Sequence, residues 1–414
     1  MAARRVVVTG VGAVTPIGNT PQEFWKSLCQ GKSGVGPITA FDCSRFDSRI
    51  AGEVRNFDPA VFINPKELKR MDRFVQFAVV AAFQALKDSG LVLEKEDVRR
   101  IGTIVGCGIG SLQVIEKEHH VMLEKGPGRM SPFLIPMLIV DMAAGQLSIQ
   151  LGIKGPNSCV ATACASGSNA IGDAFKIIQR GDADMMFAGG TEAAITTMGI
   201  GGFCAMRALS TRNDDPDHAS RPFDSGRDGF VMSEGAGIVV LEELEHARRR
   251  GASIYAEMVG YGMAGDAYHM TSPSPDGDGP ARCMKAALED AKLNPEAIHY
   301  INAHGTSTKV GDKVETLAIK HVFGEWAKKV PVSSTKSMTG HMLGAAGGAE
   351  LVLLCFVVKE DIVPPTINYV DPDAECDLDY VPNTARTAKV ESAMSNSFGF
   401  GGHNATLILK KFRG

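Results

Sequence analysis

Residues 166–190 read SGSNAIGDAFKIIQRGDADMMFAGG, and this stretch decides the class of fold. Apolar residues recur every three or four positions from Ser166 to Arg180, which predicts a helix with one buried face. The apolar run at 185–190 ends in two glycines and predicts a short buried strand. A helix followed directly by a buried strand is typical of layered α/β proteins.

The same alternation extends along the whole chain. Further strands are predicted at 6–10, 101–106, 254–259, 299–303 and 405–409, and further helices at 74–89, 280–291 and 347–359. The two halves look like two copies of one plan, 1–255 and 256–414. Because no low-complexity linker separates these halves, we expect them to share one core.

The composition is that of a soluble globular protein, because 44% of the 414 residues are hydrophobic and 22% are charged. The formal net charge of -4 gives no overall basic field, so nucleic-acid binding has no electrostatic support. No apolar run reaches the length of about 18 residues that a membrane span needs. We therefore expect neither nucleic acid nor membrane as a partner.

The cysteines indicate a reducing compartment. Nine are scattered along the chain with no CxxC pair, which disfavours a zinc site or a disulfide framework. The first residues show no signal-peptide pattern. We predict a cytoplasmic protein without a metal site.

Cys164 is the first candidate for chemistry, since it lies among small residues directly before the helix predicted at 166–180. The helix dipole and the free backbone N–H groups at such a position favour the nucleophilic thiolate. A cysteine at an arbitrary position is more often a packed core residue. The other candidate segments of the sequence must therefore decide whether Cys164 is a nucleophile or a packed core residue.

Three other segments carry candidate residues. His304 ends a predicted strand, where ligands gather in α/β sheets. Lys336 lies five residues before His341, just ahead of a glycine-rich helix start. Three glycines surround Phe400 within 396–404 and suit an oxyanion site or a mobile gate. The ordinary alternatives are a structural histidine, a solvated lysine and a tight loop around a packed phenylalanine.

Competing motifs fail on inspection. Residues 31–33 resemble the end of a phosphate-binding loop, but Lys26 occupies the position of the required glycine. Residues 106–111 follow a predicted strand, but Ser111 replaces the third glycine of a dinucleotide fingerprint. The paired histidines at 119–120 lack a nearby ligand set. No nicotinamide cofactor or metal is indicated.

Together the four candidate segments resemble the β-ketoacyl-acyl-carrier-protein synthases of the thiolase-like superfamily, specifically the elongating synthase I/II group. The likeness runs the length of the chain and includes 6–12, 181–184, 208–213, 221–224, 227–230 and 268–273. It implies an α/β fold, a thiolase-like αβαβα five-layer sandwich made of two similar halves. It also implies a homodimer and an acyl carrier protein as partner.

The resemblance implies roles for individual residues. Cys164 would be the nucleophile, and His304 and His341 would complete a Cys-His-His triad. Lys336 would lie beside this triad and contribute positive charge. The chain-starting synthase III branch uses Cys-His-Asn instead, so two histidines favour an elongating enzyme. Backbone N–H groups of Cys164 and Phe400 would hold the oxyanion, and Phe400 would also act as a gate.

The implied reaction is a decarboxylative Claisen condensation. An acyl group is first transferred to Cys164. Malonyl-carrier then loses carbon dioxide, and the resulting enolate attacks the acyl-enzyme to give 3-oxoacyl-carrier. No cofactor is expected, because the substrates carry phosphopantetheine on the carrier protein.

The resemblance extends to the surroundings of the triad. Thr306 and Thr308 would bind the phosphopantetheine arm, and Ile109 and Phe133 would line the acyl pocket. The acidic carrier is expected to dock on a basic patch, for which the candidates are Lys66, Lys69, Arg70, Arg129 and Arg207. His403 departs from the family pattern, which more often has threonine there, and we treat it as structural.

Three alternatives have different sequence requirements. A degradative thiolase would need a second catalytic cysteine in 396–404, and none is present there. A non-catalytic subunit of the same fold would normally lack Cys164. A polyketide ketosynthase shares every active-site motif and stays open, although a free-standing chain favours fatty-acid synthesis.

Overall fold

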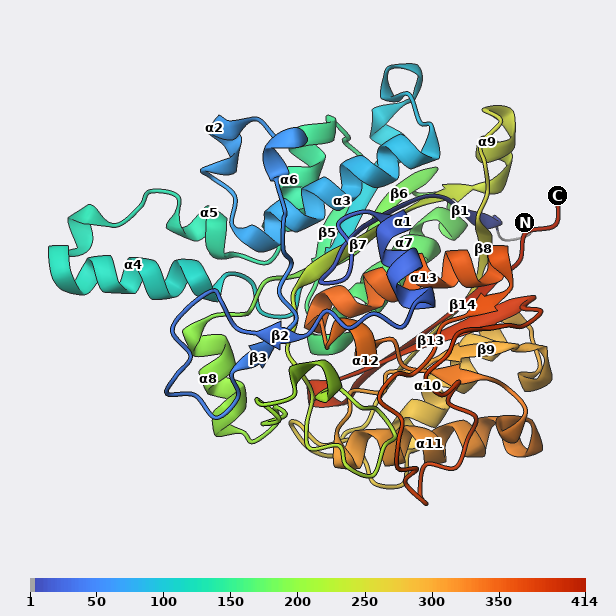
Figure 1. Ribbon diagram of the computed structural model, residues 1–414. Coiled ribbons are helices and arrows are strands. Elements are labelled where there is room, and N and C mark those ends of the chain that lie inside the picture. Colours follow the sequence, from blue (N-terminus) through green and yellow to red (C-terminus); the bar gives the residue numbers. More distant parts are fainter. Residues whose placement is uncertain (1–3) are drawn as a thin grey trace.

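The computed structural model describes residues 4–414, in which ten strands form one mixed sheet. The strand order is β10-β9-β13-β14-β8-β1-β7-β6-β4-β5 (Figure 1). The strands are β1 (Val6–Val14), β4 (Ile101–Gly106), β5 (Asn157–Val160), β6 (Met185–Glu192), β7 (Gly235–Glu243), β8 (Ala256–Gly265), β9 (Tyr300–Asn302), β10 (Val332–Ser333), β13 (Ser392–Gly399) and β14 (His403–Lys410). Two small sheets pair β2 (Gly36–Pro37) with β3 (Ile50–Ala51), and β11 (Ile362–Val363) with β12 (Arg386–Thr387).

The two halves of the large sheet repeat one topology. Outward from the β1–β8 junction, each half presents its own first, fifth, fourth, second and third strand. The outer three strands of each half are parallel and the inner pairings are antiparallel. The expectation of two similar halves is therefore confirmed. The division between residues 255 and 256 stays a prediction, and it lies immediately before β8.

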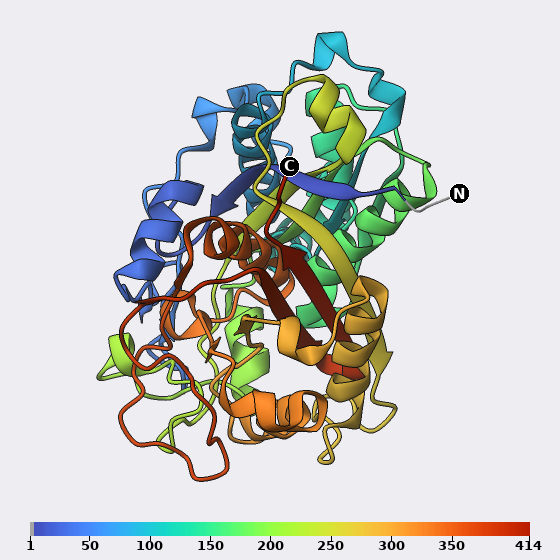
Figure 2. The same ribbon diagram turned by 90° about the vertical axis from the view of Figure 1, so that its right-hand side faces the viewer.

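Helices arrange the halves in five layers. On the outer face of the N-terminal half lie α3 (Arg73–Ser89) and α6 (Met142–Leu151). Between the two half-sheets lie α7 (Ser166–Arg180) and α13 (Ala346–Glu360), which contact strands of both (Figures 1 and 2). The outer face of the C-terminal half is covered by α10 (Asp278–Ala291) and α11 (Lys309–Phe323). This is the αβαβα order that the resemblance implied.

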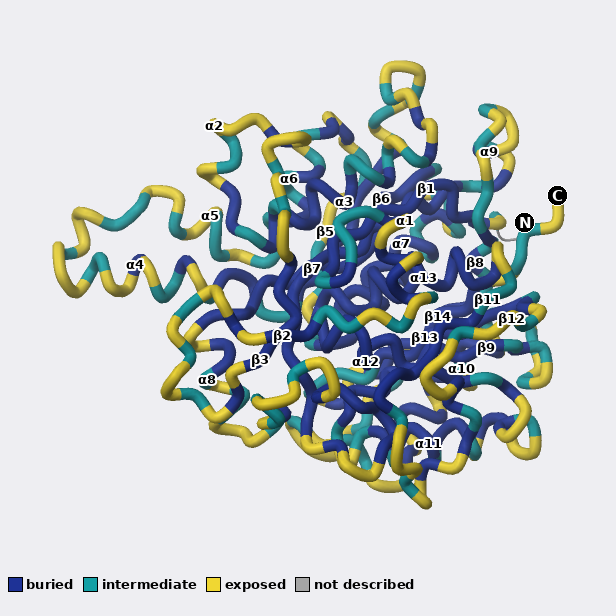
Figure 3. Tube along the Cα trace, in the orientation of Figure 1, coloured by how far each residue is buried: buried dark blue, intermediate teal, exposed yellow. Residues whose placement is uncertain are grey.

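Alternation along the strands explains the layers. On β6, Met186 and Ala188 face the core around α7 and α13, whereas Met185 and Phe187 face α3. Because both faces are buried, the strand reads as a continuous apolar run. Figure 3 shows the large sheet and the two central helices as mostly buried chain.

The remaining helices lie at the edges of this body. They are α1 (Pro21–Cys29), α2 (Pro65–Leu68), α4 (Leu112–Lys125), α5 (Leu134–Leu138), α8 (Thr197–Ala205), α9 (Leu244–Arg249) and α12 (Lys336–Thr339). In Figure 1, α4 and α5 form an arm that projects from the body. No helix in the described range 4–414 is long and apolar enough to cross a membrane.

Candidate active site

The N-terminal ends of the two central helices meet. Each helix follows a short turn whose first residue has left-handed backbone, Ala163 at φ 49° before α7 and Leu343 at φ 48° before α13. A Cβ added to Gly167 would lie only 2.8 Å from the carbonyl oxygen of Gly344, so glycine permits this close approach. These two matching turns place Cys164 beside the segment that follows His341.

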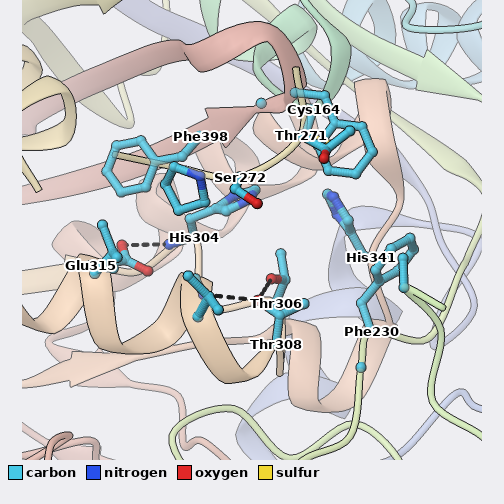
Figure 4. A pocket seen from close by; sticks show the side chains of 18 of the residues that line it. Cys164, Phe230, Thr271, Ser272, His304, Thr306, Thr308, Glu315, His341 and Phe398 are labelled. Carbon is cyan, nitrogen blue, oxygen red and sulfur yellow. Dashed lines mark hydrogen bonds between the residues drawn. The ribbon is translucent and has the colours of Figure 1, made fainter. Parts of the chain in front are cut away.

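A pocket of about 340 Å³ opens at this meeting point. It is lined by side chains from both halves, and Figure 4 shows the rings of His304 and His341 turned toward the same space as Cys164. The residues singled out in the sequence that line it are Cys164, Arg207, His304, Thr306, Thr308, His341 and Phe400. The fold thus brings together segments that are up to 236 residues apart in the chain.

The thiol of Cys164 is more acidic at a helix start than in a core, but burial opposes ionisation here. The side chain is 8% exposed, and burial raises its pKa to about 12. The positive charge of Lys336 and the backbone N–H groups of Phe400 and Cys164 lower this pKa, whereas Glu192 raises it. The backbone N–H groups at the helix start therefore favour the thiolate as expected, but burial outweighs them and the pKa of the resting thiol lies above its ordinary value.

His304 and His341 face each other with ring centroids 5.4 Å apart and ring planes at 87°. Burial lowers the pKa of both imidazoles well below the ordinary value, and the charge of Lys336 lowers both further. Both rings are therefore neutral at pH 7. A neutral imidazole can accept a proton on one nitrogen and donate a hydrogen bond from the other.

A buried carboxylate on α11 holds the His304 loop. The backbone N–H groups of His304 and Gly305 donate to Glu315 at 2.8 Å and 2.7 Å, and Figure 4 shows the contact with His304. Burial raises the pKa of Glu315 to about 7. The sequence interpretation missed Glu315, although it lies on the apolar face of α11 next to Val314, which was a usable signal.

Lys336 is not a solvated surface charge. It begins α12, is 2% exposed, and its ammonium group donates to the buried carboxylate of Glu350 on α13. Burial raises the pKa of Glu350, and the charge of Lys336 lowers it. The sequence interpretation missed Glu350 too. Its signal was a lone acid inside the apolar run of α13.

Phe400 lies in the turn between β13 and β14. Gly401 and Gly402 have φ of 80° and 72°, and the Gly401 N–H donates to the carbonyl oxygen of Met270 at 2.7 Å. Phe400 itself is half-buried. His403 is exposed at the start of β14, and a Cβ on Gly401 would meet its ring at 3.0 Å.

The predicted substrate contacts separate into two groups. Thr306 and Thr308 lie in the pocket with their hydroxyl oxygens 3.2 Å apart. Ile109 packs against the apolar cluster that contains Cys164, but it does not line this pocket. Phe133 lies on the α4–α5 arm, is 38% exposed, and does not line this pocket of its own chain either.

The five basic residues predicted for docking are all exposed. Lys66, Lys69 and Arg70 lie on or directly after α2, Arg129 lies in the turn after α4, and Arg207 lies at the pocket. The guanidinium carbon of Arg70 lies 5.2 Å from the ring centroid of Phe133. The sequence interpretation missed Lys309, an exposed cation that also lines the pocket.

The described residues offer no metal centre. Nowhere in 4–414 do three or more His, Cys, Asp or Glu side chains form a group that could hold a metal ion.

Known proteins match the chain from end to end. The sequence profile of the beta-ketoacyl synthase N-terminal domain matches residues 3–247, and that of the C-terminal domain matches 255–370. The 3-oxoacyl-[acyl-carrier-protein] synthase 2 of Synechocystis sp. is 58% identical over 410 residues, which cover 99% of each chain.

Solved structures agree. A beta-ketoacyl synthase from Burkholderia phymatum has a TM-score of 0.92 at 39% identity, covering 99% of this chain and 100% of that one. A type II PKS ketosynthase, solved in complex with its acyl-carrier protein, also has a TM-score of 0.92, at 38% identity and the same coverage. The chain therefore belongs to the beta-ketoacyl synthase family.

Proposed function

We propose that this protein is a 3-oxoacyl-acyl-carrier-protein synthase of type 2, which elongates acyl chains in fatty-acid synthesis. It condenses an acyl-enzyme thioester with malonyl-carrier, and it releases carbon dioxide and free carrier. The observation that carries this proposal is the meeting of Cys164, His304 and His341 in one pocket. The full-length relative at 58% identity supports the type.

The first half-reaction starts from a neutral thiol. As the sulfur of Cys164 attacks the acyl thioester carbonyl, a neutral histidine accepts its proton. The tetrahedral oxyanion is stabilised by the backbone N–H groups of Cys164 and Phe400, a kind of contact worth about 3 kcal/mol each in transition-state binding. The carrier thiol leaves with a proton, and the acyl group stays on Cys164.

The second half-reaction uses the neutral state of both imidazoles. Each N–H can donate to the thioester oxygen of malonyl-carrier, which stabilises the enolate as carbon dioxide departs. The enolate carbon then attacks the acyl carbonyl, and the sulfur of Cys164 leaves as a thiolate, which takes up a proton from solvent to restore the resting thiol. The charge of Lys336 lowers the pKa of this thiol and so favours its departure.

The carrier protein is the proposed partner, and no bound cofactor is needed. Thr306 and Thr308 supply hydroxyl groups for the phosphopantetheine arm inside the pocket. Arg207 and Lys309 place positive charge at the same pocket for an acidic carrier. The related type II PKS ketosynthase was solved with its acyl-carrier protein.

A homodimer in the cytoplasm is the proposed working form. The α4–α5 arm exposes Leu123, Phe133, Ile135 and Ile139, which a second copy would cover. β5 lies at the edge of the large sheet and is free to pair. In such a dimer Phe133 would contribute to the acyl pocket of the partner rather than to its own.

A polyketide ketosynthase is the second candidate, favoured by the structural match at 38% identity to a type II PKS enzyme. One experiment separates the two. The protein is incubated with a ladder of saturated acyl-carriers and malonyl-carrier, and products are identified by mass. Single 3-oxoacyl products, two carbons longer and absent with Cys164→Ala, support fatty-acid elongation. Repeated extension to poly-3-oxo chains supports the polyketide candidate, and no carbon dioxide release contradicts both.

A further inference from the structure

A buried carboxylate lies beside the nucleophile without a cation. Glu192 ends β6 and is 0% exposed, and within the described part of the chain no Lys, Arg or His forms an ion pair with it. Backbone N–H groups of Gly108 and Gly344 donate to its Oε2 at 2.9 Å and 3.1 Å. The Ile109 N–H and the Cys107 thiol donate to Oε1 at 3.2 Å and 3.3 Å. Four donors thus converge on this carboxyl group. Burial, the larger effect, raises its pKa, whereas these hydrogen bonds lower it.

These donors belong to two segments that pack near Cys164. The loop after β4 carries Ile109, and Gly344 directly follows Leu343. Ile109 and Leu343 both pack in the apolar cluster that contains Cys164. The carboxylate of Glu192 therefore holds two apolar segments, which carry Ile109 and Leu343 and come from different halves of the molecule.

The loop after β4 lies close to the turn Ala163–Ala165, which contains Cys164. A Cβ added to Gly108 would lie 2.9 Å from Glu192 Oε2 and 3.3 Å from the carbonyl oxygen of Ala163. A shift of the loop that carries Gly108 would therefore disturb the packing next to Cys164.

We propose that Glu192 is a positioning residue that determines which acyl chains are accepted, because it fixes Ile109 and Leu343 around the acyl pocket. This inference rests on the proposed function, in which Ile109 lines that pocket. The negative charge of Glu192 also raises the pKa of Cys164, which gives a second observable effect of the same carboxylate.

Glu192→Gln tests the proposal in the full-length protein. The amide keeps the shape of the carboxylate. Each carboxylate oxygen accepts two hydrogen bonds, so the NH2 group of glutamine must face two donors whichever oxygen it replaces. With a ladder of acyl-carriers, we expect the ratio of kcat/KM between the best and the poorest chain length to fall at least tenfold. The pH profile of Cys164 alkylation by iodoacetamide should shift to lower pH, since one negative charge is removed.

Glu242→Gln is the matched control. Glu242 is also 0% exposed and lies on the neighbouring strand β7, where it pairs with Met185 at the opposite end of β6 from Glu192. Its partners are Arg250, His246 and Thr9, none of which lines the pocket. This variant should lose stability while keeping the chain-length ratio and the alkylation profile. If Glu192→Gln does not fold, Glu192→Asp retains the charge and should flatten the ratio without the pH shift.

The outcomes separate the inference from the function on which it rests. An unchanged ratio in folded Glu192→Gln, or an equal change in Glu242→Gln, overturns the positioning role. Ile109→Phe is measured in parallel and should selectively impair long acyl-carriers. If Ile109→Phe shifts the ratio and Glu192→Gln does not, only the role of Glu192 is lost. If Ile109→Phe also leaves the ratio unchanged, the acyl pocket itself is misplaced.

Discussion

Two opposing effects act on the sulfur of Cys164. Burial disfavours the thiolate, whereas the charge of Lys336 and two backbone N–H groups favour it. Burial is the largest effect, so the resting group is a thiol, and the proposed nucleophilic attack needs a neighbouring base to take its proton. Burial and Lys336 keep the pKa values of both histidines low, so each ring is in the unprotonated form that can accept this proton.

Lys336→Met should raise the pKa of Cys164 further, since the substitution removes the charge that lowers it. Glu350 is expected to take up a proton in this variant, because Lys336 also lowers the pKa of that carboxyl. Alkylation of Cys164 by iodoacetamide should therefore need a higher pH than in the unmodified protein. Peptide mass mapping of the alkylation rate at each pH measures this shift, because below the pKa of about 12 the rate follows the thiolate fraction. A profile that moves to lower pH contradicts the assignment.

His304→Ala and His341→Ala should impair decarboxylation more than acylation. The enolate needs hydrogen bonds from both rings, whereas one remaining histidine can still accept the thiol proton. Release of carbon dioxide from malonyl-carrier should fall by roughly 10² or more in each variant. The mass of the acyl-enzyme provides the parallel measurement of the first step. Equal losses in both steps would show that the histidines do not divide the work in this way.

Secondary-structure elements meet at the site through contacts that need small side chains. The starts of α7 and α13 touch at Gly167 and Gly344, where a Cβ on Gly167 would lie 2.8 Å from a carbonyl oxygen. β13 joins the same junction, since Ser397 and Ser168 share a hydrogen bond of 2.8 Å. The nucleophile turn is thus fixed by packing between the two halves rather than by its own helix alone.

Gly167→Ala should separate the two helix starts. The added methyl group overpacks the junction, which typically costs about 1–3 kcal/mol of stability. We expect a lower melting temperature and a larger loss of activity than the stability change explains. Gly202→Ala is the control, because Gly202 also lies in a helix, α8, and a Cβ there meets nothing within 4 Å. If both variants behave alike, the close approach does not constrain the site.

The sequence predicted several of the elements whose patterns follow burial, but it missed β7, although Gly235–Glu243 reads GAGIVVLEE and is almost entirely buried. α7 was predicted with both of its ends, and β4 and the core of β6 were predicted because continuous apolar runs mark strands buried on both faces. β13 was missed, since Ser392–Gly399 reads SAMSNSFG and has little β propensity. Its small polar side chains serve hydrogen bonds inside the core, as Ser397 does, and local propensity carries no trace of such tertiary contacts.

The candidate site residues also fall into two groups, those that a motif marks in the sequence and those that only the fold reveals. Cys164, His304, His341 and Lys336 were recognisable because motif resemblance marks them, and the fold places them in or beside one pocket. Glu192, Glu315 and Glu350 were not recognised, since an acid in a helix or at a strand end usually indicates a solvated face. Each is buried. Glu192 and Glu315 accept hydrogen bonds from backbone N–H groups of the site, and Glu350 forms an ion pair with Lys336. Phe133 does not line the pocket of its own chain, and in the proposed dimer it would instead serve the pocket of a second copy.

At the scale of the whole molecule, the central layer is shared. α13 belongs to the C-terminal half, yet it contacts β7 and β6 of the N-terminal half as well as β13. From Ala346 to Val358 every residue of this helix is buried. The largest apolar cluster draws residues from both halves, including Val8, Phe175, Leu353 and Leu407. Neither half can bury its own inner face alone.

This shared layer predicts that residues 1–255 and 256–414 do not fold as independent domains. Separated from α13, the N-terminal half would expose the inner face of β7 and part of that of β6, and each fully buried Val or Leu side chain exposed costs about 1.5–3 kcal/mol. That loss over several residues is comparable to the total stability of a typical domain, about 5–15 kcal/mol. The intact protein should therefore unfold in one thermal transition by calorimetry. Each fragment produced alone should lack that transition and expose its amides to rapid hydrogen exchange. A fragment 1–255 that melts cooperatively as a monomer would show that the halves are separate domains after all, and the common core would not be what joins the nucleophile to its histidines.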